Sequence, residues 1–477
     1  MSKDLQANVQ ALIQKETIRA VKDKQGEHYC LISNEADVVR PYLLYSNDFR
    51  IAFKKLYMQR FNEFLTSQEV QYAVELIEII GTDGVEQVEI CKRIFNNGEQ
   101  YAYELNQEGK AVWIEDGIAI TGNVEGILFK HSANYSNQAE PNLKIEPKKL
   151  LHYVRAHFNF RSEMEVKLFT LYLVTSFWGL NINHPILVIT GEKGSSKSTT
   201  MRKLEELIDP KNSVGGGIPK GADGLEIRLS NSYLLVLDNL SSLSRKVSDT
   251  LAVAATGGSV TKRALYRDTD EVVLDLKAVI AINGVSLVAK ESDLLDRSLI
   301  ITLKRLTPKE IRTEEELWNE FETDKPDILG CCFKTLAVAL NDDEPIKTQE
   351  LIRMADFHVA CIKVGRALGI SEKEVSDILW KNQSNVNKCT LDEDTVALCV
   401  IELMKKRKLY TNSVSGLLCD LQDIAYDNGM TNMVLPKTPN HLSNRLSKVK
   451  SNLQSEYGIH YTIKNKGTFK EIQIQKK

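Results

Sequence analysis

Four apolar runs without polar alternation lie in the middle of the chain. They are PILVIT, YLLVLD, AVIAIN and SLIITL, at residues 185–190, 233–238, 278–283 and 298–303. Strands that are apolar at every position are typical of a parallel sheet covered on both faces. Because helical segments lie between some of the runs, the pattern predicts an α/β core of the nucleotide-binding kind, which we expect to span residues 141–304.

The amino-terminal part has a different pattern. Segment 86–131 alternates between apolar and polar residues around the turn signal Asn96-Asn97-Gly98. It predicts a small sheet within an α+β amino-terminal domain, residues 1–140. The polar, proline-containing segment 131–149 is typical of a linker. A helix is predicted over 67–80, where apolar residues follow helical spacing at Val70, Ala73, Val74, Ile77 and Ile80.

Beyond residue 304 the pattern becomes helical again. We expect a helical lid and connector over 305–388 and a winged-helix domain over 389–477. In the latter, Thr438 is a suitable N-cap, Pro439 suits the first helical position and Gly458 suits the end of the helix. A hairpin then turns at 465–467 and forms the expected wing. The helix has an apolar stripe formed by Leu442, Leu446, Val449 and Leu453. The polar residues that we expect to face away from this stripe are His441, Asn444, Lys448, Ser451 and Asn452.

Charge is distributed unevenly along the 477 residues. Residues 403–477 contain 13 Lys/Arg and 5 Asp/Glu, a balance of +8, so the rest carries −11 within a net charge of −3. A basic tail on an acidic body favours nucleic acid or another polyanion as a partner, with a solvated surface as the alternative. The eight cysteines form no C-x-x-C pair, which argues against a zinc site.

Targeting signals are not evident in the sequence. No apolar run approaches the roughly 20 residues that cross a bilayer, and the first residues, MSKDLQANVQ, lack the apolar core of a secretion signal. We therefore expect a cytoplasmic protein.

The segment GEKGSSKST, residues 191–199, follows the first apolar run and precedes a helical stretch. It matches the phosphate-binding pattern G-x-x-x-x-G-K-[ST] except at Ser196, where the pattern has glycine. Backbone N–H groups between a strand and a helix can bind phosphate, so we expect an ATP site here. Lys197 would reach the β and γ phosphates and Ser198 would bind Mg²⁺. The expected binding residues are Gly191, Glu192, Lys193, Gly194, Ser195, Ser196, Lys197, Ser198 and Thr199.

Ser196 has two possible consequences. If its backbone has a positive φ angle, its side chain is penalised. If its φ angle is already helical, a small residue fits and its N–H can still point at phosphate.

Polar residues end the next two apolar runs. Asp238 ends YLLVLD, where an acidic residue would hold Mg²⁺, and Asn283 ends AVIAIN, where it could sense the γ-phosphate. Asn239 follows Asp238 at a position that often carries a water-activating glutamate, and an amide cannot accept that proton. Either another carboxylate activates the water, or hydrolysis is slow, or Asn239 only orients the water.

Two arginines are candidates for contact with the nucleotide. Arg297 lies immediately before the last apolar run, and Arg353 lies on a predicted lid helix. Each could stabilise transition-state charge, Arg297 as an arginine finger in a neighbouring subunit's site. The alternative for Arg297 is an ion pair with Asp293 or Asp296.

This order of motifs resembles that of an AAA+ ATPase. More narrowly, it is similar to the MCM-like replicative helicases and the Rep initiators of mobile elements, including staphylococcal pathogenicity islands and chromosomal cassettes. Three features carry the resemblance: the small residue Ser196 before the lysine, a hairpin before the Asn283 strand, and the segment LLDRSLIITL. The resemblance implies a hexamer and 3′ to 5′ travel. Asn239 departs from the Asp-Glu pair of MCM proteins.

DNA contacts are expected from two regions. SVTKRALY and EVVLDL predict a hairpin that carries Lys262, Arg263 and Arg267, and six copies in a ring could line a channel for single-stranded DNA. A solvated surface hairpin is the alternative. The winged helix could enter the major groove, with phosphate contacts from Arg445, Lys464, Lys466 and Lys470, although winged helices also bind proteins. The helix would present His441, Asn444 and Lys448.

These expectations combine into a hexameric, ATP- and Mg²⁺-dependent DNA helicase that also recognises a replication origin. One alternative is an ATP-switched origin-binding initiator that recruits a helicase without unwinding DNA itself, which Asn239 favours. The other is an AAA+ remodeller of proteins, which the basic tail disfavours.

Overall fold

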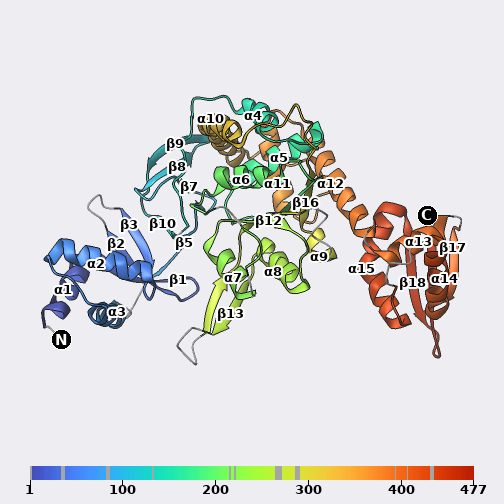
Figure 1. Ribbon diagram of the computed structural model, residues 1–477, viewed down its shortest axis with the longest axis horizontal. Helices are drawn as coiled ribbons and strands as arrows, with labels where there is room; N and C mark the ends of the chain where they lie inside the picture. Colours follow the sequence, from blue (N-terminus) through green and yellow to red (C-terminus); the bar gives the residue numbers. More distant parts are fainter. Residues whose placement is uncertain are drawn as a thin grey trace.

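The computed structural model is a mixed α/β protein with parallel and antiparallel sheets. It describes residues 3–33, 38–81, 86–131, 134–213, 216–219, 222–263, 271–284, 291–392, 394–405, 407–429 and 435–476. In Figure 1 the amino-terminal sheet and helices lie at one end, the carboxy-terminal unit lies at the other, and the parallel sheet lies between them. Within the described residues, no helix is long and apolar enough to cross a membrane.

The amino-terminal unit packs three helices against a mixed sheet of order β3-β2-β1-β4. The predicted helix over 67–80 is confirmed as α3, but Ile80 is 37 % exposed, so its place in the buried stripe was wrong. The elements are α1 (Lys3–Gln14), β1 (Ile18–Asp23), β2 (His28–Ser33), β3 (Val39–Leu43), α2 (Asn47–Phe61), α3 (Ser67–Gly81) and β4 (Gln87–Val88).

A second, antiparallel sheet has the order β6-β7-β8-β9. Its inner face belongs to the same hydrophobic core as the central parallel sheet, because Ile94, Tyr103 and Val112 pack with α5 and α10 residues. The predicted boundary at residue 140 therefore does not coincide with a boundary between hydrophobic cores. The strands of this region are β5 (Ile90–Cys91), β6 (Ile94–Asn96), β7 (Tyr101–Glu104), β8 (Lys110–Glu115), β9 (Ile118–Asn123) and β10 (Leu128–Phe129).

Segment 134–149, predicted to be part of a linker, packs against the rest of the protein. Gln138 is buried and its amide donates to the Tyr103 hydroxyl and to two carbonyl oxygens at the end of α6. Asn142 donates to Asp327 on α10 at 2.7 Å. Polar residues of this segment thus form hydrogen bonds to the end of α6 and to the middle of α10.

The four apolar runs form one parallel sheet of order β12-β15-β11-β16, as predicted. Helices α6 and α8 contact β15, and α5 and α12 contact β16. The outer edge of β16 is closed by side chains: Asn382 bonds both the N–H and the C=O of Ile300. The strands are β11 (Ile186–Thr190), β12 (Leu234–Leu240), β15 (Val279–Gly284) and β16 (Ser298–Thr302); the helices are α4 (Leu150–His157), α5 (Glu163–Thr175), α6 (Lys197–Ile208), α7 (Ala222–Asn231), α8 (Arg245–Thr256) and α9 (Ser292–Leu295), after the 3-10 turn η1 (Pro147–Lys149).

The predicted hairpin before the Asn283 strand is present. Strands β13 (Ser259–Arg263) and β14 (Glu271–Asp275) pair antiparallel and project away from the parallel sheet in Figure 1. Arg267 at its predicted tip lies outside the described residues, and for Lys262 and Arg263 only the backbone is described.

One long helix forms the first part of the helical region predicted over 305–388. Helix α10 (Glu314–Leu340) continues through Pro326, and a capping box between Thr313 and Glu316 begins it. Its burial against α4 and α5 offsets the cost of proline inside a helix. Helices α11 (Ala355–Leu368) and α12 (Glu372–Asp392) follow, and all three belong to the central core.

The carboxy-terminal unit has its own core, which begins at Leu391. Helix α15 runs from Pro439 to Tyr457 with Thr438 as N-cap, and Gly458 after it has a φ angle of 64°, as predicted. The strand β17 between the first two helices was not predicted. The elements of this unit are three helices and a three-stranded sheet of order β17-β19-β18: α13 (Thr395–Lys405), β17 (Leu409–Ser413), α14 (Val414–Asp427), α15 (Pro439–Tyr457), β18 (Ile459–Asn465) and β19 (Lys470–Lys476).

Candidate functional site

The loop 191–196 connects β11 to the amino terminus of α6. Gly191, Gly194 and Ser196 all have positive φ angles, of 150°, 79° and 62°. A Cβ atom on Gly191 would meet Ser195 Oγ at 2.6 Å and the Leu303 carbonyl at 3.0 Å, so the loop requires glycine there. Between the two possibilities for Ser196, the structure selects the strained one: a serine occupies a left-handed position that favours glycine.

Lys197 and Ser198 are the first two residues of helix α6, beside Asp238 of strand β12. Lys197 Nζ donates to the carbonyl oxygens of Gly191 and Glu192, at 2.7 and 2.9 Å. Ser198 Oγ donates to Asp238 Oδ1 at 3.0 Å. Partial burial lowers the pKa of Lys197, and the nearby Asp238 carboxylate opposes that shift. The structure therefore brings a cation, a hydroxyl and a carboxylate together at the amino terminus of one helix.

Asn239 and Asn283 meet at the same edge of the sheet. The Asn239 backbone N–H donates to Asn283 Oδ1 at 2.7 Å. Asn239 is exposed and has a φ angle of 57°, and the pairing of β12 with β15 shifts register between Leu237 and Leu240. Because asparagine adopts left-handed backbone more readily than glutamate, this irregularity gives a conformational reason for an amide at position 239.

Two buried polar atoms in this cluster have no hydrogen-bond partner among the described residues. They are Ser195 Oγ and Asn283 Nδ2, in residues that are each 1 % exposed. Leaving a buried donor unpaired costs about 1–3 kcal/mol, so such groups are expected where another molecule supplies the partner. The donors Lys197 Nζ, Ser195 Oγ and Asn283 Nδ2 suit the phosphates of a nucleoside triphosphate, and the Ser198 and Asp238 oxygens suit Mg²⁺. The remaining predicted loop residues line the outside: Glu192 and Lys193 are exposed, and Thr199 is half-buried in the first turn of α6.

Arg297 lies at the opposite edge of the parallel sheet. Its carbonyl accepts from Ile186 N–H at 2.8 Å, so it sits beside the start of β11, whereas Lys197 follows the end of that strand. Five strand residues at roughly 3.3 Å each separate the two edges by about 16 Å. Arg297 therefore does not contact the nucleotide loop of its own chain.

The alternative predicted for Arg297, an ion pair, is present. Its guanidinium pairs with the Asp293 carboxylate and also donates to the Asp293 carbonyl at 2.8 Å. Arg353 shares this carboxylate, with Nη2 at 3.6 Å, and pairs with Asp296 at 3.0 Å. Burial raises the pKa of Asp296, and Arg353 opposes that shift. Two arginines thus form one cluster with two aspartates.

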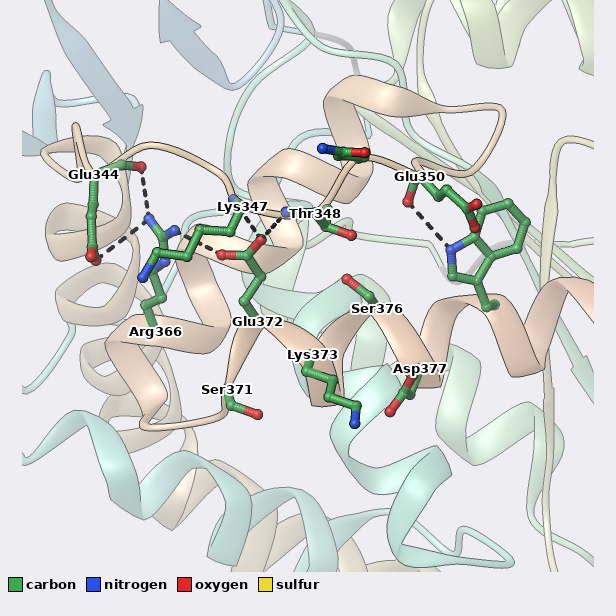
Figure 2. Close-up of a pocket in the computed structure, with 12 residues that line it drawn as sticks. Glu344, Lys347, Thr348, Glu350, Arg366, Ser371, Glu372, Lys373, Ser376 and Asp377 are labelled. Atoms are coloured by element: carbon green, nitrogen blue, oxygen red, sulfur yellow. Dashed lines mark hydrogen bonds and ion pairs between the residues drawn. The ribbon is translucent and has the colours of Figure 1, made fainter.

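Arg353 is not on a helix, which corrects the prediction. It lies in the bend before α11, and the segment leading to it is anchored beside a pocket on α11 and α12. Figure 2 shows Glu372 accepting from Lys347 and Thr348 N–H and pairing with Arg366. The pocket contains none of the predicted nucleotide or DNA residues.

The face of α15 expected to meet DNA is exposed in its first half. His441, Asn444 and Lys448 are exposed, and the apolar stripe Leu442, Leu446, Val449 and Leu453 is buried. Asn452 is only 5 % exposed, so the prediction that it faces away from the core was wrong. The end of α15 packs on α12, where Ser384 donates to Glu456 at 2.6 Å.

The four predicted phosphate contacts differ in their surroundings. Lys464 is exposed on β18, Lys466 lies 3.6 Å from Glu471, and Lys470 donates to Asn440 at 3.3 Å. Arg445 instead forms a short ion pair with Asp394, whose side chain is 6 % exposed. This ion pair was not predicted. The sequence offered a signal only for the other role of Asp394, because an aspartate immediately before a helix is a favourable N-cap.

Comparison with known proteins gives two family matches. Residues 153–377 match the family described as "Actinomycete integrative conjugative element replication protein", and residues 396–477 match the "AICE RepA C-terminal domain". No curated protein matches the chain. Both families are replication proteins of a mobile element, which agrees with the expected class, but the type of element differs from those named in the resemblance.

Solved structures with similarity to the chain include the C-terminal region of NrS-1. The "A form apo structure of NrS-1 C terminal region-CTR" is 14 % identical, with a TM-score of 0.40 and coverage of 100 % of each chain. A further apo structure of this region, residues 305–718, is also 14 % identical, with a TM-score of 0.40 and coverage of 100 % of this chain and 99 % of that chain.

Proposed function

We propose that this chain, whose residues 153–377 and 396–477 match two family models of replication proteins of actinomycete integrative conjugative elements, is an ATP-dependent DNA helicase and replication initiator. The observation that carries the proposal is the cluster at the carboxyl edge of the parallel sheet. There Lys197 and the Ser198–Asp238 pair lie at one helix terminus, and Asn283 Nδ2 has no partner among the described residues. The predicted AAA+ type of core is part of this proposal.

ATP would bind on the loop 191–199, with Lys197 at its phosphates and Asn283 at the γ-phosphate. Ser198 and Asp238 would hold Mg²⁺, which supplies charge neutralisation at the phosphates when bound. The Lys197 ammonium, now donating to two loop carbonyls, would exchange these for phosphate oxygens. Ser195 Oγ and Asn283 Nδ2 would gain the partners that they lack.

Arg297 would act on the nucleotide of a neighbouring copy in a hexamer. Its position at the amino edge of the sheet, about 16 Å from its own loop, supports action across a subunit interface. Arg353 shares Asp293 with it, so both arginines would face the same neighbour.

DNA would meet two parts of the chain. The β13–β14 hairpin projects from the core and would carry Lys262, Arg263 and Arg267 toward a single strand. The carboxy-terminal unit, with its exposed helix face and wing lysines, would bind duplex DNA at an origin. A protein that couples the two would unwind the origin that it recognises.

The alternative is an origin-binding initiator that recruits a helicase and does not unwind. Asn239 supports it, because an exposed amide at the end of the acidic strand cannot take a proton from water. The two proposals differ in one measurable activity.

Strand displacement on a forked duplex tests the proposal, with ATP hydrolysis measured in the same samples. We expect wild type to unwind, Lys197→Ala to lose hydrolysis and unwinding, and Arg267→Ala to lose mainly unwinding. The control is Arg245→Ala, which removes an exposed arginine on α8. Hydrolysis without unwinding by wild type rejects the helicase in favour of the initiator, and unwinding by Lys197→Ala rejects the nucleotide site.

A further inference from the structure

Helix α15 carries one exposed polar stripe. His441, Asn444, Arg445 and Lys448 follow the spacing i, i+3, i+4 and i+7, so they lie along one face, away from the buried apolar stripe. His441, Asn444 and Lys448 are exposed at the surface. Arg445 is the member of this stripe that the structure holds in place.

Asp394 is the residue that holds it. Asp394 Oδ1 accepts the Ala397 N–H at 3.0 Å and so caps α13, while Oδ2 accepts from Arg445 Nε. The Asp394 side chain is 6 % exposed, whereas that of Arg445 is 49 % exposed. The backbone of α13 therefore fixes the buried carboxylate. The carboxylate in turn fixes the guanidinium through Nε, and the Arg445 side chain remains partly exposed.

Within the described residues, Nε is the one nitrogen of Arg445 that has a protein partner. The two terminal nitrogens, Nη1 and Nη2, therefore remain as a planar pair of donors. Such a fork matches two acceptors side by side, and guanine presents O6 and N7 in this way in the major groove. Fixing the guanidinium beforehand also reduces the entropy lost on binding.

The charge of the pair argues against a phosphate contact. Arg445 and Asp394 together carry no net charge, so displacing counterions from phosphate with this pair gains little. A neutral pair with two directed donors suits the neutral edge of a base. Lys464 on β18, which is exposed and lies on the wing, is better suited to phosphate.

We propose that Arg445 reads a guanine in duplex DNA through Nη1 and Nη2, and that Asp394 positions it. This inference rests on the proposed binding of duplex DNA by the carboxy-terminal unit. It replaces the phosphate contact predicted for Arg445 with a role in specificity. Asp394 is a positioning residue that does not itself touch DNA.

The test begins with the full chain and a random duplex library, from which the preferred sequence of wild type is selected. Each guanine of that sequence is then replaced by 7-deazaguanine, which lacks N7, and affinity is measured at several salt concentrations. We expect replacement of one guanine to lower the affinity of wild type by roughly 5- to 150-fold, the equivalent of about 1–3 kcal/mol. Arg445→Ala should bind both duplexes equally, with little change in the salt slope.

Two further variants separate the roles. Asp394→Asn can still cap α13 but loses the charge that holds Nε, so we expect the guanine preference to fall with little loss of thermal stability. Lys464→Ala should weaken all sequences alike and reduce the salt slope by about 1. Arg445→Lys should not restore the preference, because an ammonium has no fork.

Several results would overturn the inference. A uniform loss of affinity in Arg445→Ala, with a salt slope reduced by about 1, would make Arg445 a phosphate contact. Unchanged preference in Arg445→Ala would leave the ion pair a purely structural link, and unchanged preference in Asp394→Asn would reject Asp394 as the positioning residue. If wild type bound duplex DNA without sequence preference, this inference alone would fail, whereas no duplex binding at all would reject the proposed origin binding as well.

Discussion

The backbone N–H of Asn239 donates to Asn283 Oδ1 across 2.7 Å and joins the ends of two neighbouring strands. This bond uses the oxygen of the Asn283 amide and leaves Nδ2 buried without a partner among the described residues. The bond therefore fixes the orientation of the Asn283 amide and directs Nδ2 away from β12. A nucleotide that binds beside Asp238 would meet a hydrogen-bond donor already in place.

Replacing Asn283 with alanine should lower both stability and ATP hydrolysis. The substitution leaves the Asn239 N–H without its acceptor, which costs about 1–3 kcal/mol. We expect a lower melting temperature and a lower turnover than for Asn239→Gly, which keeps the backbone bond and tolerates the positive φ angle. Equal melting temperatures for the two variants would show that the bond does not contribute to stability.

Ser196 offers a test of strain in the phosphate loop. Its φ angle of 62° lies in the left-handed region, where a side chain costs roughly 1 kcal/mol and a β-branched residue costs more. We expect Ser196→Gly to bind a fluorescent ATP analogue at least as well as wild type. Ser196→Val should weaken binding several-fold, and equal affinities for the valine and glycine variants would contradict the left-handed backbone at this position.

Action of Arg297 across an interface can be tested by mixing two inactive variants. Lys197→Ala lacks the lysine of its own site but retains Arg297, and Arg297→Ala has the reverse defect. Mixed oligomers contain interfaces in which both residues are intact, so ATP hydrolysis should partly return. Hydrolysis that stays at the level of the separate variants, in oligomers shown to exchange subunits, would place both residues in one subunit's site.

The stability of the central core should depend on pH through Lys203. This lysine of α6 is 2 % exposed, donates to the His157 carbonyl at 3.2 Å and lies over the Phe321 ring. Burial lowers the pKa of Lys203 to about 8, whereas an unfolded lysine titrates near 10.4. Between these values the unfolded chain holds a proton that the folded chain has released, so the contribution of Lys203 to the free energy of unfolding should rise with pH.

The measurement is chemical unfolding at several pH values between about 7.5 and 9.5, above the usual titration of histidine and below that of tyrosine. The slope of the free energy of unfolding against pH should be less positive for Lys203→Met than for wild type, while Lys381→Met, an exposed control on α12, should leave it unchanged. Other buried groups also set the slope of wild type: burial lowers the pKa of Lys92 to about 8, which adds to the rise, and raises the pKa of Cys30 and Cys332, which opposes it. An unchanged slope in Lys203→Met would mean that Lys203 keeps its proton when buried.

Local patterns in the sequence determined much of this architecture. Four uniformly apolar runs predicted the four strands of the parallel sheet, since only a doubly covered sheet buries every side chain of a strand. The bounds of α15 followed from Thr438, Pro439 and Gly458, because capping acts within a few residues of a helix end. The loop between β11 and α6 was predicted in the same way, from a motif that occupies nine consecutive residues, and its binding of phosphate stays a prediction.

Contacts between distant residues were decided by the tertiary structure alone. The φ angle of Ser196 depends on how β11 and α6 are joined over the sheet, and the burial of Asn452 depends on packing around α15. Arg297 and Lys197 are 100 residues apart in the sequence, and only the parallel pairing of β11 with β16 places them at opposite edges. Likewise, Asp394 and Arg445 meet because α13 packs on α15. Residue types show which groups are available for chemistry, whereas their distances and their burial depend on which elements pack together.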